Sequence, residues 1–273
     1  MRTRAATEVR YAVLQHTLEI PAVDRLRRAF ESVRSLTAAD APGLANDAYG
    51  VLVKNLSTAD AQVLKRALEA EGIQTELVPD RLLPQLPSTK FVRRLEFGPD
   101  ALLIHDPLGR RVPVEYRHLL ILAVGTVETV EFRRSEPIAS SIPRLSRRIS
   151  GLRMQLEEFD RARGTRQREV RVRRRFIELI LSRGVARFTI EVEANQQLLF
   201  QALGDRRTSD LELDLALLVR QLSAAAPNLL LNRGAYLLRA DPPTSHTYPS
   251  RNAFYEEITW MLWQAAKRDR GDR

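Results

Sequence analysis

Two stretches near the start of the chain are related by a constant offset of 38 residues, and this internal repeat constrains the fold strongly. The stretch YAVLQHTLEIPAVDRLRRAF, 11–30, aligns with YGVLVKNLSTADAQVLKRAL, 49–68, and seven of the twenty positions are identical. In each copy an apolar run is followed by apolar residues at three- and four-residue spacing. Each copy therefore predicts a strand followed by a helix.

Helix-boundary residues sharpen this prediction. Pro21 suits the first helical position of the first copy. In the second copy Ser57 is expected to cap the helix, Asp60 completes a capping-box pattern, and Gly72 is expected to end the helix. Residues 73–78, IQTELV, then alternate like a strand. The order strand–helix, strand–helix–strand predicts a small sheet that contains parallel strands.

This βα-βαβ order resembles, at the level of the fold, the ferredoxin-like modules found in small regulatory and protein-binding domains. The resemblance covers residues 9–79 and lacks one strand of the full pattern. It rests on no functional residue, so it implies a fold and not an activity.

Residues 83–133 predict a β meander after the proline-punctuated stretch RLLPQLP, 81–87. Asp106, Pro107 and Gly109 are typical of a type I turn, and Pro113 indicates an edge strand because proline donates no ladder hydrogen bond. The layout resembles the small lipid- or peptide-binding β modules of pleckstrin type. Residues 134–168 are rich in Arg, Ser and Pro and predict a basic linker.

Residues 169–273 predict a C-terminal domain made of a hairpin and helices. Two apolar runs flank Ser182-Arg183-Gly184, Ser209 and Glu212 form a capping-box pattern, and a last helix is expected over about 250–267. The predicted fold class is therefore α+β. Its predicted domains are a repeat-built ferredoxin-like-type unit (1–82), the β meander (83–133), the basic linker (134–168) and the hairpin-plus-helices domain (169–273).

The positive charge of the chain is concentrated in one region. The net charge is +9, but residues 130–176 alone hold fourteen arginines and six acids. Lysine occurs only four times, so the excess of arginine also fits a bias in base composition. Arginines are the candidates for binding an anion or a nucleic acid, and they are Arg161, Arg163, Arg166, Arg168, Arg171, Arg173, Arg174 and Arg175.

Several interpretations of these arginines stay open, and binding to an anionic membrane or to an acidic protein is among them. In an extended strand Arg171, Arg173 and Arg175 share one side and could follow a row of phosphates. Only Phe159 and Phe176 flank the run, however, whereas single-strand binders alternate aromatic side chains with charge. The alternative is a linker that leads into a charged edge strand, which resists aggregation.

The last helix carries the candidate partner-binding residues, Trp260 and Trp263. They project from nearly the opposite side to Phe254, Ile258 and Leu262, where a polar face is expected. Tryptophan is enriched at interfaces, so a surface for a partner protein or a second copy is one interpretation. The other is that this helix is buried on both sides between two layers of its own chain.

No sequence motif predicts catalysis, a cofactor or a metal ion. The sequence lacks a nucleophile elbow, a phosphate-binding loop and a His-Glu-x-x-His pattern, and the four histidines are far apart. The absence of cysteine excludes disulfides and fits a reducing compartment. The longest apolar run, LLILAV at 119–124, is far short of the roughly 20 residues of a membrane span. No integral membrane segment is expected, and the expected location is the cytoplasm.

The functional prediction is therefore a non-catalytic protein-interaction or regulatory module that binds another protein or itself. The alternative is a sequence-nonspecific nucleic-acid-associated protein that uses the arginines of residues 161–175. An enzyme whose site is assembled from distant residues is a third hypothesis, without positive evidence in the sequence.

Overall fold

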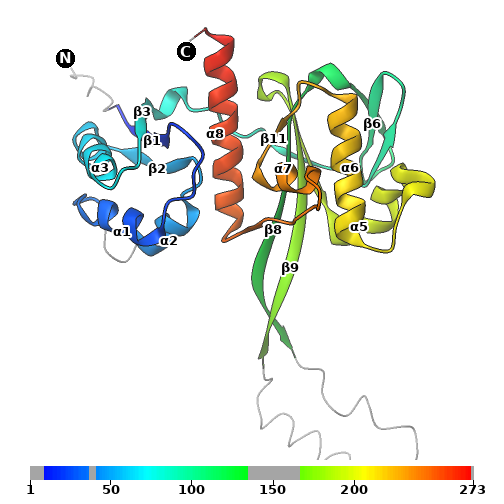
Figure 1. The fold of residues 1–273 in the computed structure, drawn as a ribbon, viewed down its shortest axis with the longest axis horizontal. Coiled ribbons are helices and arrows are strands. Elements are labelled where there is room, and N and C mark those ends of the chain that lie inside the picture. Colours follow the sequence, from blue (N-terminus) through cyan, green and yellow to red (C-terminus); the bar gives the residue numbers. More distant parts are fainter. Residues whose placement is uncertain (1–8, 37–40, 135–166, 272–273) are drawn as a thin grey trace, which may run out of the picture. The chain divides into compact units, whose positions relative to one another are not determined.

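The computed structural model describes residues 9–36, 41–134 and 167–271 (Figure 1). Its described part is a mixed α+β structure with three sheets and seven α-helices. The strands are β1 (Tyr11–Gln15), β2 (Val51–Leu56), β3 (Thr75–Pro79), β4 (Thr89–Phe91), β5 (Arg94–Phe97), β6 (Ala101–His105), β7 (Arg111–Glu115), β8 (Leu119–Arg134), β9 (Gln167–Leu181), β10 (Arg187–Glu191), β11 (Leu230–Leu231) and β12 (Thr247–Tyr248). The helices are α1 (Val23–Glu31), α2 (Ala41–Asp47), α3 (Thr58–Ala70), α5 (Val192–Leu199), α6 (Leu211–Ala225), α7 (Arg233–Arg239) and α8 (Arg251–Asp269).

The chain divides into two compact units. The larger consists of Met1–Val127 and Arg174–Arg273, and the smaller is Glu128–Arg173. The division cuts through β8 and β9, and the predicted domain boundaries stay a prediction. The predicted basic linker, 134–168, falls almost entirely outside the described residues.

The N-terminal sheet has the order β2-β1-β3, and β1 is antiparallel to both neighbours. Two strands of this sheet, β2 and β3, run in the same direction, but they are separated by the antiparallel β1. The reason is α2, a short helix that the sequence pattern does not predict. It adds a second reversal between β1 and β2, so β2 returns antiparallel to β1. The single helix α3 then brings β3 back in the direction of β2, on the other side of β1.

Two pairs of equivalent positions in the repeat have the same burial. Val13 and Val51 are both buried in their strands, and Leu26 and Leu64 are both buried in their helices. Ser57 caps α3 as predicted, because its side chain accepts a hydrogen bond from the backbone N–H of Asp60 at 3.1 Å. The first helix begins two residues later than the position that Pro21 suggests, at Val23.

The six-stranded sheet has the order β11-β8-β9-β10-β4, with β12 paired to β8. Along β8 the side chains of Leu122 and Val124 enter one core, under α6, and those of Ile121 and Ala123 enter another, under α8. The hairpin between β9 and β10 is antiparallel as predicted. Because both faces of the sheet are covered, β8 carries apolar side chains on both of its sides.

A separate three-stranded antiparallel sheet, β5-β6-β7, forms the meander, and β7 with Pro113 is an edge strand as predicted. One helix cap differs from the prediction. Asp210, not Ser209, caps α6, because its carboxylate accepts from the N–H groups of Glu212 and Leu213 at 2.8 and 3.2 Å. Ser250 caps α8, which begins at Arg251, close to its predicted start.

Helix α8 is in contact with two layers of the chain. Phe254, Ile258 and Leu262 pack against the six-stranded sheet. On the other side Trp263 joins Ala12, Leu14, Val51 and Val78 of the N-terminal sheet. Burial of a helix on two sides requires apolar groups on more than one face. We use the name seam for the boundary between two parts of the chain. On one side are α8 and the β11–α7 segment, and on the other are the N-terminal elements.

Candidate ligand-binding site

The two candidate partner-binding tryptophans bond within the chain. The indole N–H of Trp260 donates to the carbonyl of Gln15 at 2.7 Å, and that of Trp263 donates to Oε1 of Glu76 at 2.8 Å. Trp263 is only 7% exposed. This packing matches the interpretation in which α8 lies between two layers. Binding of a partner through Trp260 and Trp263 stays a prediction.

The eight candidate arginines have unequal environments. Arg161, Arg163 and Arg166 lie outside the described residues, and Arg168 lies in β9. Arg171, Arg173 and Arg174 are exposed, and Nε of Arg173 is 2.7 Å from Oε1 of Glu128.

Arg175 differs from these exposed neighbours, because its side chain is only 18% exposed and pairs with Glu193 at 3.0 Å. Extended structure at residues 169–175 agrees with the prediction. The structure therefore brings Arg171 and Arg173 to the surface of β9 and uses Arg175 to tie β9 to α5.

A buried polar network lies beside α8, on the side of the seam formed by β8, α7 and β12. Asn232 caps α7, and its side-chain amide uses both its oxygen and its nitrogen in hydrogen bonds. Its Oδ1 accepts from the N–H groups of Val124 and Ala235, each at 2.9 Å. Its Nδ2 donates to the carbonyl of Val124 at 3.1 Å and to the hydroxyl of Tyr248 at 2.8 Å. The Tyr248 hydroxyl in turn donates to Oε2 of Glu257. The backbone N–H of Arg233 donates to the other carboxylate oxygen at 2.7 Å.

Burial controls the protonation of this network. It raises the pKa of the Glu257 carboxyl, although the hydrogen bonds from Tyr248 and Arg233 oppose the change. Burial and the nearby Glu257 carboxylate raise the pKa of the Tyr248 phenol. Burial, reinforced by the positive charge of Arg233, lowers the pKa of His246 to about 4. His246 packs edge-on against Tyr248, with the ring centroids 4.6 Å apart.

A second buried carboxylate, Glu178, is held by hydrogen bonds and an ion pair that join several elements of the core. It accepts from the hydroxyl of Thr189 at 2.6 Å and pairs with Nε of Arg187 at 3.2 Å. Arg187 also contacts Thr89 and Tyr255, which come from different strands and helices of the same core. Burial raises the pKa of Glu178. These contacts clamp β9, β10, β4 and α8 together.

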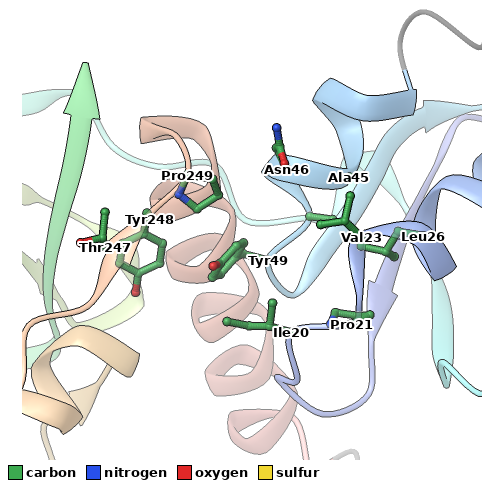
Figure 2. A pocket seen from close by; sticks show the side chains of 11 residues that line it. Ile20, Pro21, Val23, Leu26, Ala45, Asn46, Tyr49, Thr247, Tyr248 and Pro249 are labelled. Carbon is green, nitrogen blue, oxygen red and sulfur yellow. The ribbon is translucent and has the colours of Figure 1, made fainter. Parts of the chain in front are cut away.

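An apolar cavity of about 250 Å³ lies on one side of the network. Figure 2 shows Tyr49 in the middle of its lining, with Tyr248 and Pro249 on one side and Val23 and Leu26 on the other. Ile20 and Val23, at the rim, are 43% and 44% exposed. The cavity therefore offers an apolar surface that is open to solvent.

A second cavity, of about 280 Å³, lies where Glu257 lines the seam. Its walls are apolar on several sides and carry four further polar side chains. The lining residues are Leu18, Leu230, Leu231, Arg233, Tyr236, Glu257, Trp260, Met261, Gln264 and Arg268. Apolar walls with a few converging polar groups are the usual form of a ligand site. The two cavities and the network between them form the candidate site.

Sequence reasoning missed most of this site, apart from Trp260. One signal was available, because Glu257 falls three residues after Phe254 and one before Ile258, on the apolar face of the last helix. A carboxylate in such a stripe needs buried hydrogen-bond donors. Tyr248 and Arg233 supply them from distant parts of the chain, and no spacing in the sequence indicates that meeting.

Within residues 9–36, 41–134 and 167–271, no helix is both long and apolar enough to cross a lipid bilayer. In the same ranges no three His, Asp or Glu side chains converge as the ligands of a metal ion would. Comparisons of the chain with protein-family models, with curated proteins and with solved structures find no match.

Proposed function

We propose that this chain is a non-catalytic, cytoplasmic protein-interaction or regulatory module whose ligand-binding site lies at the seam. The observation that carries the proposal is the open apolar cavity around Tyr49, with Ile20 and Val23 exposed at its rim. The occupant that fits such a lining is an apolar side chain of a partner polypeptide. N-terminal residues and C-terminal residues both line the cavity, so an occupant would affect how these parts pack.

The hydrogen bonding of Glu257 supports a binding role for the site and not a catalytic one. Both oxygens of its carboxylate accept hydrogen bonds from groups of the chain itself. A general base needs a lone pair directed at the proton that it removes. The network instead holds α7, β12 and α8 in register beneath the two cavities.

The ferredoxin-like-type layout and the four predicted domains belong to the same proposal. In the N-terminal sheet β2 and β3 run in the same direction with the antiparallel β1 between them. A split βαβ arrangement of this kind is a component of ferredoxin-like modules. It supports the proposal that the repeat-built unit is a small regulatory module.

A second candidate function is nonspecific binding of nucleic acid through β9. The observation that favours it is the exposure of Arg171 and Arg173 on one side of an extended strand. Each phosphate that such a strand neutralises would make affinity fall with salt. Arg173 is paired with Glu128, which reduces the charge available to a phosphate.

One retrieval experiment tests both functions. The tagged full-length protein captures partners from a lysate of its source at low and high salt, with and without nuclease. Ile20→Glu places a charge at the rim of the apolar cavity. Val63→Glu is its matched control, because Val63 is 42% exposed on α3 and lines none of the described cavities. A double variant, Arg171→Gln with Arg173→Gln, tests the strand.

We expect a nuclease-resistant protein partner that Ile20→Glu releases and Val63→Glu retains. Release by both variants, or by neither, would contradict the seam as the docking site. Capture that vanishes with nuclease, high salt and the double arginine variant would instead establish the second function. Circular dichroism of each variant checks that the fold is intact.

A further inference from the structure

The second seam cavity has a distinct chemical character along one face of α8. Glu257, Trp260, Met261, Gln264 and Arg268 recur at three- and four-residue spacing and line it together. From Trp260 to Arg268 this face changes from an indole through an amide to a guanidinium. An amphipathic ligand lying along the helix would therefore meet apolar groups at one end and hydrogen-bond donors at the other.

At the polar end, Nε2 of Gln264 and the guanidinium of Arg268 have no hydrogen-bond partner within the described residues. Within the described residues neither Arg233 nor Arg268 forms an ion pair with a carboxylate through its guanidinium group. Both residues are exposed, so the groups are free to turn toward a ligand. Nε2 of Gln264 is buried without a hydrogen-bond partner in the described part. A buried amide without a partner is unfavourable, and a bound acceptor would satisfy it.

We infer that this cavity binds an organic carboxylate attached to an apolar body. The carboxylate is assigned to Arg268 and Gln264, because a guanidinium group binds a carboxylate in two parallel hydrogen bonds. The apolar body is assigned to Leu18, Leu230 and Met261, with Trp260 beside them. A cavity of about 280 Å³ fits a single ring or a short chain. The inference deepens the proposed function, since it places a small ligand at the same seam.

Among the described residues Glu257 is the one acidic side chain that lines this cavity, and its charge would oppose an anion. Its two oxygens are occupied by the Tyr248 hydroxyl and the Arg233 backbone N–H. The positive charge of Arg233 acts on this carboxylate, and Arg268 lies about three helical turns away along α8. The balance at the polar end favours a negatively charged group.

The experiment measures binding of phenylacetate to the purified full-length protein by isothermal titration calorimetry. Phenylacetamide, a neutral molecule of nearly the same shape, is the matched control ligand. We expect phenylacetate to bind at least about tenfold more tightly than the amide. Arg268→Gln should remove about this tenfold preference. Arg66→Gln removes the same charge from α3, outside the cavity, and should leave binding unchanged.

Fluorescence locates the bound molecule, because the chain has only two tryptophans. Trp260 lines the cavity and Trp263 does not. The change in emission on adding phenylacetate should persist in Trp263→Phe and vanish in Trp260→Phe. N-acetyl-glycyl-phenylalanine and its C-terminal amide, titrated in parallel, distinguish a free small acid from the carboxyl terminus of a peptide.

Equal affinity for acid and amide would overturn the inference, since the cavity would then recognise only the apolar body. Failure of phenylacetate and of the acetylated dipeptide to bind would overturn it as well. The proposed function fails by a different result, the loss of discrimination between Ile20→Glu and Val63→Glu. The two outcomes are thus separable.

Discussion

At the scale of single residues, the polar groups of the seam are stable only in the protonation states that their neighbours favour. His246 lies against Tyr248, and the charge of Arg233 acts on it. Its Nε2 atom is buried without a hydrogen-bond partner in the described part. A positive charge on this ring would therefore be buried beside another positive charge. The neutral imidazole is the form that suits the fold.

This environment predicts a dependence of stability on pH. The folded pKa of His246 is about 4, below its ordinary value of 6.5, so the unfolded chain binds more protons between these values. The stabilising effect of the neutral ring is complete above pH 6.5 and is lost as the pH falls through 4. His246→Phe keeps a ring against Tyr248 and cannot titrate. As the pH falls from 6.5 to 4, the wild type should lose about 1 to 2 kcal/mol more unfolding free energy than this variant. This figure allows for the solvent-accessible part of the ring.

Urea denaturation of both proteins at several pH values measures this difference. Carboxylates such as Glu257 titrate in both proteins, so their effect cancels in the comparison. The difference in unfolding free energy should stay constant between pH 7 and pH 8. Parallel loss of stability by the two proteins between pH 6.5 and pH 4 would exclude the assigned role of His246.

At the scale of elements, local signals predicted most helices and strands but not how the strands pair. Apolar periodicity placed α1 and α3, and Ser57 marked the start of α3 because a cap acts within a few residues. Helix α2 has a proline and a glycine in seven residues, which hides it from such patterns. If a single helix joined β1 and β2, these two strands would be expected to run in the same direction. Strand direction thus depended on an element with weak local propensity.

The contact between α7 and β8 is a close approach of two backbones. A Cβ atom on Gly234 would lie 1.9 Å from the carbonyl oxygen of Val124, so the helix or the strand would have to move. We expect Gly234→Ala to lower the free energy of unfolding by about 3 kcal/mol or more, because the obstacle is backbone and cannot rotate away. Thermal and urea denaturation measure the loss.

Gly43 provides the matched control for Gly234. It also lies within a short helix, α2, but a Cβ atom there would have nothing within 4 Å. Gly43→Ala should raise stability by about 0.5 to 1 kcal/mol through its higher helix propensity. Similar effects of the two substitutions would mean that α7 does not rest on β8 as described.

At the scale of the whole molecule, the site joins residues that are far apart in the chain. Leu18 and Arg268 line one cavity, and Tyr49 and Tyr248 line the other. The sequence indicated that α8 is unusual, because Trp260 and Trp263 lie on the face that a helix buried on one side only would expose to solvent. It did not show which partners they find, because Gln15 and Glu76 are paired with them by tertiary packing alone. The amino-acid composition of a helix can indicate that it is buried on two sides. It does not indicate which part of the chain forms the second layer.

The packing of Trp263 gives α8 a role in the cooperativity of the larger unit. Its side chain fills the core that Ala12, Leu14, Val51 and Val78 form with the helix, and its indole N–H binds Glu76. Trp263→Ala would remove this core contact and leave a cavity, at a cost of about 3 to 5 kcal/mol. Trp263→Phe should cost less, since it keeps most of the apolar area and loses mainly the hydrogen bond to Glu76.

If α8 joins its two layers into one cooperative unit, Trp263→Ala should shift a single unfolding transition without splitting it. Far-ultraviolet circular dichroism reports all helices, and the fluorescence of Trp260, the remaining tryptophan, reports the seam. Coincident urea midpoints for the two signals are expected in the wild type and in both variants. An early fluorescence transition in Trp263→Ala, followed by later loss of helix, would show that the N-terminal sheet separates first. In that case the release of a partner by Trp263→Ala would reflect opening of the seam and not loss of a direct contact, so Ile20→Glu is the more selective probe of binding.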